Sequence, residues 1–145
     1  MLNDGTDMSS FYQRARRHSN TVLLVQTIDD MLIGYFSACA WHEDASYYGS
    51  GESMLFSFRQ KDSDNVDVYK WTGKNVLFQY SSATKIAAGG GGGGFGFILD
   101  NDFRSVASYA CETYGNMQSL LSGPSPDSLS LGSNVVNAEL WTFQL

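Results

Sequence analysis

The sequence predicts a mainly β protein at the margin of the α+β class: a sandwich of two antiparallel sheets with one or two short flanking helices. Short runs of branched and aromatic residues recur along the chain and are separated by Gly, Asn, Asp and Ser, which is the pattern of strands joined by turns. Such sheets bury one face against each other. With 145 residues, 43% of them hydrophobic, residues 1–145 can bury a core as a single domain.

The individual elements follow from local patterns. Residues 9–17 predict a short helix, because Asp7 or Ser9 can cap it and arginines gather at its C-terminal end. Its buried stripe would be Phe11, Tyr12 and Ala15. Branched and aromatic runs predict a hairpin of residues 21–27 and 32–36, and further strands at 54–58, 66–71, 76–80, 95–99 and 138–143.

Two further patterns concern exposure. Val66 and Val68 alternate with Asp67, which predicts a strand with one buried and one solvated face. Residues 119–133 hold both prolines of the chain and are rich in serine. We therefore expect a surface loop there.

Composition excludes several classes of function. The net charge is −6, whereas a nucleic-acid binder needs a basic face, so nucleic acid is not an expected partner. No apolar run approaches the roughly 18–20 residues that a membrane-spanning helix needs, so membrane insertion is not expected. Cys39 and Cys111 are the only cysteines, too few for a disulfide framework, and we expect both to be reduced thiols.

A run of six glycines, residues 89–94, is the most unusual feature of the chain. It satisfies the dinucleotide-binding pattern G-x-G-x-x-G trivially, at Gly91, Gly93 and Gly96. A phosphate-binding loop must open a helix, but this run leads into the predicted strand 95–99. We favour a backbone role, in which residues without Cβ let neighbouring groups approach closely, and expect no cofactor.

The glycine run and four other segments resemble, in the same order, the motifs of TLDc domains, which are the domains of the oxidation-resistance proteins. The segments are Trp41 with residues 47–58, then residues 68–75, 87–100, 111–116 and 139–143. The resemblance implies a TLDc-like sandwich of two antiparallel sheets. Family domains usually begin with a further helix and strand, so the resemblance also implies that this domain is N-terminally short.

The resemblance further implies a non-enzymatic, cytoplasmic interaction domain that binds subunits of the vacuolar proton-pumping ATPase (V-ATPase), regulates it, and contributes to protection against oxidative stress. Peripheral association with the vacuole or lysosome through the pump is compatible with this, and mitochondrial association stays open. Two alternatives remain: an adaptor for another cytosolic partner, and a thiol-dependent antioxidant, which would need an exposed thiolate of lowered pKa.

The candidate binding or structural residues come from the same segments. Trp41, Tyr47, Tyr48 and Glu52, together with Gly91, Gly92, Gly93 and Gly94, are candidates for a contact surface or its support. Glu52 and Glu112 fall on motif glutamates, and a carboxylate pair could perform acid–base chemistry. We favour structural hydrogen bonding for both, and expect no catalytic residue.

Cys39 and His42 are spaced so that they suggest a Cys–His nucleophile, or part of a metal site with Cys111. A structural zinc site usually takes four ligands. The other histidine, His18, lies at the basic end of the predicted helix. We therefore expect no metal site and interpret His42 as a loop residue beside Trp41.

Overall fold

The structure, a computed structural model, describes residues 8–44, 46–58, 66–100, 102–121 and 131–142. One helix and ten strands lie in these ranges: α1 Met8–Ala15, β1 Thr21–Thr27, β2 Leu32–Ser37, β3 Ser46–Tyr48, β4 Met54–Phe58, β5 Asp67–Lys70, β6 Gln79–Ser81, β7 Ile86–Ala88, β8 Phe97–Asp100, β9 Ser105–Ala107 and β10 Gly132–Thr142. Within the described ranges, no helix is long and apolar enough to span a membrane.

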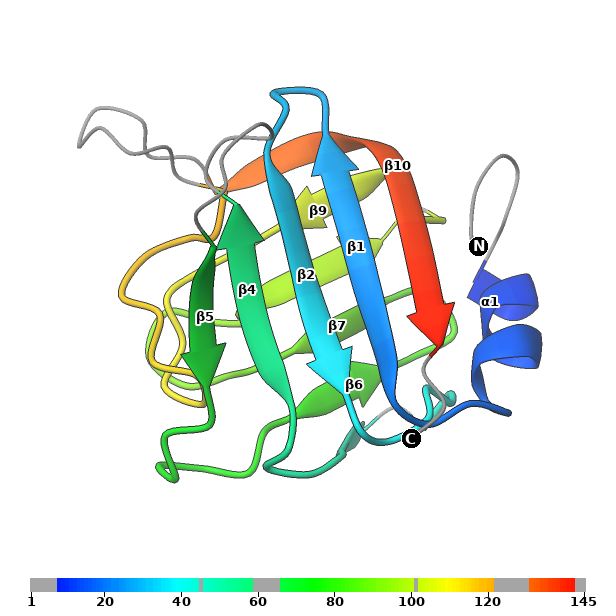
Figure 1. The fold of residues 1–145 in the computed structure, drawn as a ribbon, viewed down its shortest axis with the longest axis horizontal. Coiled ribbons are helices and arrows are strands. Elements are labelled where there is room, and N and C mark those ends of the chain that lie inside the picture. The colour runs from blue at the N-terminus through cyan, green and yellow to red at the C-terminus, as the bar shows by residue number, and fades with distance from the viewer. Residues whose placement is uncertain (1–7, 45, 59–65, 101, 122–130, 143–145) are drawn as a thin grey trace.

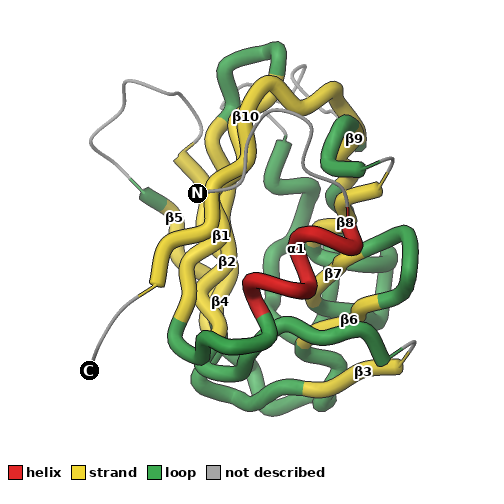
Figure 2. The backbone as a smooth tube through the Cα atoms, turned by 90° about the vertical axis from the view of Figure 1, so that its right-hand side faces the viewer, coloured by secondary structure: helices red, strands yellow, loops and turns green. Residues whose placement is uncertain are grey.

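The strands pair in the order β3-β6-β7-β8-β9-β10-β1-β2-β4-β5, and every pairing between them is antiparallel. The long strand β10 pairs with β9 through its first residues and with β1 through the rest. It therefore joins two layers, which we call the front sheet (β10, β1, β2, β4, β5) and the back sheet (β3, β6, β7, β8, β9) (Figures 1 and 2). The predicted fold class, a mainly β sandwich, is confirmed.

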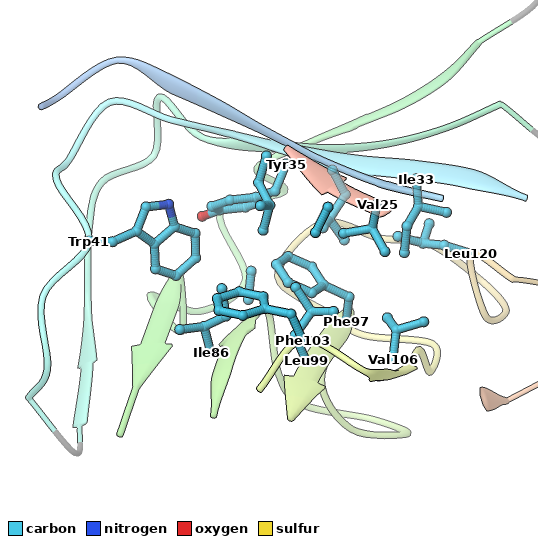
Figure 3. Close-up of a cluster of buried hydrophobic side chains, with 14 of the residues drawn as sticks. Val25, Ile33, Tyr35, Trp41, Ile86, Phe97, Leu99, Phe103, Val106 and Leu120 are labelled. Carbon is cyan, nitrogen blue, oxygen red and sulfur yellow. The ribbon is translucent and has the colours of Figure 1, made fainter. Parts of the chain in front are cut away.

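The core lies between the two sheets. In β1 the side chains alternate between buried and partly exposed positions, so that Leu23 and Val25 face inward. They meet buried side chains of the back sheet, among them Ile86, Leu99 and Val106 (Figure 3). Burying an aliphatic or aromatic side chain contributes about 1.5–3 kcal/mol, so this layer accounts for the main stabilisation of the sandwich.

Helix α1 closes one open side of the sandwich (Figure 2). The predicted stripe is confirmed, because Phe11, Tyr12 and Ala15 are all buried. The Phe11 ring lies 6.2 Å from that of Trp41 and 5.1 Å from that of Phe103. The Tyr12 hydroxyl donates a 2.6 Å hydrogen bond to the carbonyl of Ser82, which ties the helix to the loop after β6.

Local boundaries differ from the prediction where side chains redirect the backbone. Strand β6 begins at Gln79 rather than residue 76, because the amide of Leu77 donates to Asn75 Oδ1 and that of Phe78 to the carbonyl of Val76. The predicted buried face of residues 66–71 is wrong. Val66 and Val68 are 42% and 45% exposed, whereas Tyr69 packs against the core.

The sequence also missed β3, β7, β9 and the first half of β10. Part of that half overlaps the predicted surface loop 119–133, since Gly132 and Ser133 belong to β10. At the N-terminal end of the predicted loop, Ser119, Leu120 and Leu121 are buried. There the Ser57 Oγ of β4 donates a hydrogen bond to the Leu120 carbonyl on the inner side of the front sheet. Residues 122–130 of the predicted loop lie outside the described residues.

Candidate functional site

Three loops come together at the glycine run, and we call residues 71–77, 89–94 and 111–116 the glycine platform. The amide of Glu112 donates to the carbonyl of Gly90 at 3.0 Å. Gly92 and Cys111 form an isolated antiparallel bridge. The third loop joins through Thr72, whose amide donates to the Thr113 carbonyl at 2.9 Å. Segments far apart in the sequence thus form one surface.

Thr113 is the central side chain of the platform. It is fully buried, and its hydroxyl accepts the amide of Gly90 at 3.0 Å and donates to Asn75 Oδ1 at 2.6 Å. The Asn75 amide group in turn donates to the Gly90 carbonyl at 3.4 Å. One hydroxyl therefore holds all three loops in register, as expected of a buried polar group with satisfied partners.

The glycine run adopts a backbone that other residues rarely adopt. The φ angles of Gly91, Gly92 and Gly94 are +80°, +74° and +149°, values that favour residues without Cβ. The run continues into β8, a strand, and not into a helix. At Gly91 a Cβ would also stand 3.3 Å from Glu112, so the Glu112 side chain covers backbone that carries no side chain. Gly93 completes the run, and its amide donates to the Ala110 carbonyl.

The two candidate glutamates are both exposed and lie on different loops. Glu112 stands over Gly91 and Gly92. Glu52 follows Gly51, against which the Trp71 ring packs. The amide of Glu52 donates to Ser50 Oγ at 3.4 Å. In the part of the chain that the structure describes, no hydrogen bond or shared partner joins the two carboxylates. Exposed carboxylates of this kind suit binding to a basic partner better than paired acid–base chemistry, which needs mutual positioning.

The aromatic candidates support the surface more than they form it. Trp41 is 0% exposed, so it is a core residue and can act only as support. The hydroxyl of Tyr47 donates to the Gly89 carbonyl at 3.1 Å, beneath the run, and burial raises the pKa of Tyr47 to about 12. The Tyr48 hydroxyl bonds to Ser81 Oγ at 2.6 Å and accepts the amide of His42; burial likewise raises the pKa of Tyr48.

Sequence reasoning missed a chain of buried hydroxyls under the platform. The Tyr114 hydroxyl lies 2.6 Å from that of Tyr35 and 2.6 Å from Ser53 Oγ, and Ser53 donates to the Ser50 carbonyl. Burial raises the pKa of Tyr114 to about 12. The chain links the front sheet to the loop 111–116. Thr113, Tyr114 and Asn75 lie inside motifs that the sequence displays, but nothing in the pattern singled them out.

The two thiols have different surroundings. Both cysteines are free, Cys39 partly exposed and Cys111 buried. Cys111 Sγ donates to Asn116 Oδ1 at 3.0 Å, and burial raises its pKa above the usual value. His42 stacks on Tyr48, with ring centroids 4.0 Å apart. No cluster of three potential metal ligands occurs among the residues that the structure describes.

Exposed apolar side chains lie on the platform and directly after it in the sequence. Trp71 is 41% exposed, Val76 65% and Met117 90%. Trp71 and Val76 belong to the loop 71–77, and Met117 follows Asn116, which is anchored by hydrogen bonds to the carbonyls of Tyr109 and Gln118. Exposed large apolar side chains on neighbouring loops are a common feature of protein-binding surfaces.

The fold and the platform together define a class: a two-sheet β-sandwich domain whose candidate site is built from loops at the end of the sandwich. Comparison with known proteins narrows this class. The family model of the TLDc domain matches residues 1–144. The chain therefore belongs to the TLDc domain family, and the predicted resemblance is confirmed.

The chain is similar to nuclear receptor coactivator 7 and to oxidation resistance protein 1 of several vertebrates. The chain is 32% identical over 146 residues to nuclear receptor coactivator 7 of Gallus gallus, which covers 99% of this chain. It is 33% identical over 113 residues to oxidation resistance protein 1 of Bos taurus, covering 77%, and 32% identical over 141 residues to that of Xenopus laevis, covering 97%. The chain spans only 15%, 12% and 15% of the lengths of these three relatives.

Proposed function

We propose that this TLDc domain is a protein-interaction domain that binds the V-ATPase through the glycine platform, regulates the pump, and thereby contributes to protection against oxidative damage. The proposal places the domain in the cytoplasm, at the vacuolar or lysosomal surface when it is bound. Its support comes from membership of the TLDc family, from relatives named oxidation resistance proteins, and from the surface that the platform presents.

The observation that carries the choice of surface is the exposure of Val76, on a loop of the platform, and of Met117, which directly follows another of its loops. Both apolar side chains are more than half exposed, yet their loops are held together by the hydrogen bonds of Thr113. A preorganised surface binds more tightly because little conformational entropy is lost on association. Glu112 adds a negative charge that suits a basic patch on the partner.

Vesicle acidification tests the proposal. Purified domain is added to vacuolar vesicles, and ATP-driven acidification is recorded together with release of the soluble sector of the pump. We expect wild-type domain to reduce acidification, and Val76→Lys or Met117→Lys to remove most of the effect. The matched control is Val68→Lys, an exposed valine of β5 outside the platform, which should act like wild type.

The alternatives make different predictions in the same assay. A folded domain that neither binds the vesicles nor changes acidification would favour the adaptor for another partner. The thiol-dependent alternative has less support, because Cys111 is buried and its pKa is raised rather than lowered.

A further inference from the structure

All five strands of the front sheet place apolar side chains on its outer face, beside polar side chains that include Gln26 and Asn137. Alternation places on it the side chains that the core does not use, and all of them are partly or well exposed. The apolar residues of this face, which we call the outer patch, are Val22, Leu24, Leu32, Phe36, Met54, Phe56, Phe58, Val68 and Trp141. Solvated sheet faces normally carry polar side chains, so this composition needs an explanation.

The strand register makes the outer patch continuous. Val22 lies opposite both Trp141 and Phe36, and Phe36 lies opposite Met54. In the adjacent row, Leu24 lies opposite Gly34 and Phe56 lies opposite Val68. The Phe56 ring extends over Gly34, where a Cβ would collide with it, so no gap is left at the centre of the sheet.

No described helix or strand lies over this face. In Figure 1 the front sheet faces the viewer without an element crossing it, and Figure 2 shows α1 and the back sheet on its other side. From strand spacings of about 4.8 Å and a rise of about 3.4 Å per residue, the face measures roughly 400 Å². Contiguous apolar patches of this size on a monomer are often functional.

Two opposite charges lie at the two edges of the same face. Glu139 of β10 is paired with Leu24, and Lys70 of β5 is paired with Met54, so both side chains share the outer patch's side of the sheet. Glu139 is held in place by the Trp141 indole, which donates to Oε2 at 3.0 Å, and by Asn137, which donates to Oε1 at 3.3 Å. Strand β2 lies midway between the two charged edges.

We propose that the outer patch binds a second copy of this chain, face to face, about a two-fold axis parallel to β2. Rotation about that axis brings each β10 edge over the partner's β5 edge. Glu139 of one copy then lies level with Val68 of the other copy. Lys70 of that copy lies two residues further along the strand, about 7 Å of rise, which the long lysine side chain spans to reach Glu139. The two equivalent charge pairs flank a closed apolar centre, which is the self-complementarity that a two-fold dimer requires.

The size of the patch indicates a small interface. Two faces of roughly 400 Å² bury on the order of 800–1,000 Å² in total, at the low end for a specific interface. We expect a concentration-dependent monomer–dimer equilibrium. Pump binding through the glycine platform uses other residues, so the two interactions are separable.

Sedimentation equilibrium of the purified chain over a hundredfold concentration range tests the proposal. We expect a reversible monomer–dimer equilibrium that Val68→Lys weakens at least tenfold. Val76→Lys, a valine-to-lysine change on the glycine platform, is the matched control and leaves the equilibrium unchanged. Circular dichroism establishes that each variant is folded.

Charge reversal tests the geometry. Glu139→Lys and Lys70→Glu should each weaken self-association, because each homodimer then sets like charges against each other. An equimolar mixture of the two variants should form a heterodimer, because every facing pair is again of opposite sign. A chain that stays monomeric at all concentrations overturns the proposal, as does dimerisation that Val68→Lys leaves intact, or a mixture no more associated than its components.

Discussion

Replacing Thr113 by valine, which has nearly the same shape, should loosen the glycine platform while leaving the sandwich folded. The change removes the acceptor of the Gly90 amide and the donor to Asn75 Oδ1. Gly90 is buried, and an unsatisfied buried amide costs about 1–3 kcal/mol, while the lost bond to Asn75 costs about 1 kcal/mol. We expect a total loss of about 2–4 kcal/mol, a large share of the roughly 7–15 kcal/mol that stabilises a domain of this size.

Urea unfolding, followed by tryptophan fluorescence, measures this loss. With a slope of about 2 kcal/mol per molar urea, the midpoint should fall by about 1–2 M. Thr84→Val, at an exposed threonine, is the control and should change stability by less than about 0.5 kcal/mol. Thr113→Ser keeps the hydroxyl and should lie between the two. If Thr113→Val shifted the midpoint no more than Thr84→Val, the central role assigned to this hydroxyl would be refuted.

Three further predictions concern other parts of the structure. Gly34→Ala should destabilise the front sheet by about 1–3 kcal/mol, because its Cβ would come 2.6 Å from the Leu23 carbonyl; an unchanged melting temperature would contradict the close packing described. The free energy of unfolding should fall as the pH rises from 10 to 12, because a tyrosine in the unfolded chain has a pKa near 10 whereas burial raises the pKa of Tyr114 to about 12. In alkaline unfolding experiments, the Tyr114→Phe variant should show a shallower fall. Replacing Cys39 and Cys111 together by serine should preserve any effect on pump acidification, and loss of that effect in a folded variant would revive the thiol mechanism.

The parts of the fold that the sequence predicted are those whose local pattern agrees with their burial. The α1 stripe of Phe11, Tyr12 and Ala15 was predicted because its helical spacing follows a single buried face. The hairpin of β1 and β2 was predicted because both strands are runs of branched and aromatic residues around a polar turn. Strand β7 was missed because all three of its residues are buried, which removes the alternation that identifies a strand. The burial predicted for Val66 and Val68 was wrong because an alternating pattern does not say which face of a strand is buried.

The sequence singles out some residues of the candidate site but not the contacts that hold it together. The glycine run and the two glutamates stand out in the sequence, and the structure places Gly91, Gly92 and Glu112 together. The central role of Thr113 depends on contacts with Asn75 and Gly90, 38 and 23 residues away. Tertiary contacts of that range leave no periodic trace in the sequence. Trp41 was predicted to belong to a contact surface or to its support, and its full burial leaves the supporting role, since tryptophan is common both in cores and at interfaces.

The most direct test of the account is equilibrium binding of the fluorescently labelled domain to purified V-ATPase, with wild type, Met117→Lys and Val68→Lys compared side by side. The account predicts saturable binding by the wild type, at least tenfold weaker binding by Met117→Lys, and wild-type affinity for Val68→Lys at concentrations below those that favour dimers. Absence of binding by the folded wild type, or equal binding by Met117→Lys, would contradict the claim that the glycine platform is the surface through which this domain acts.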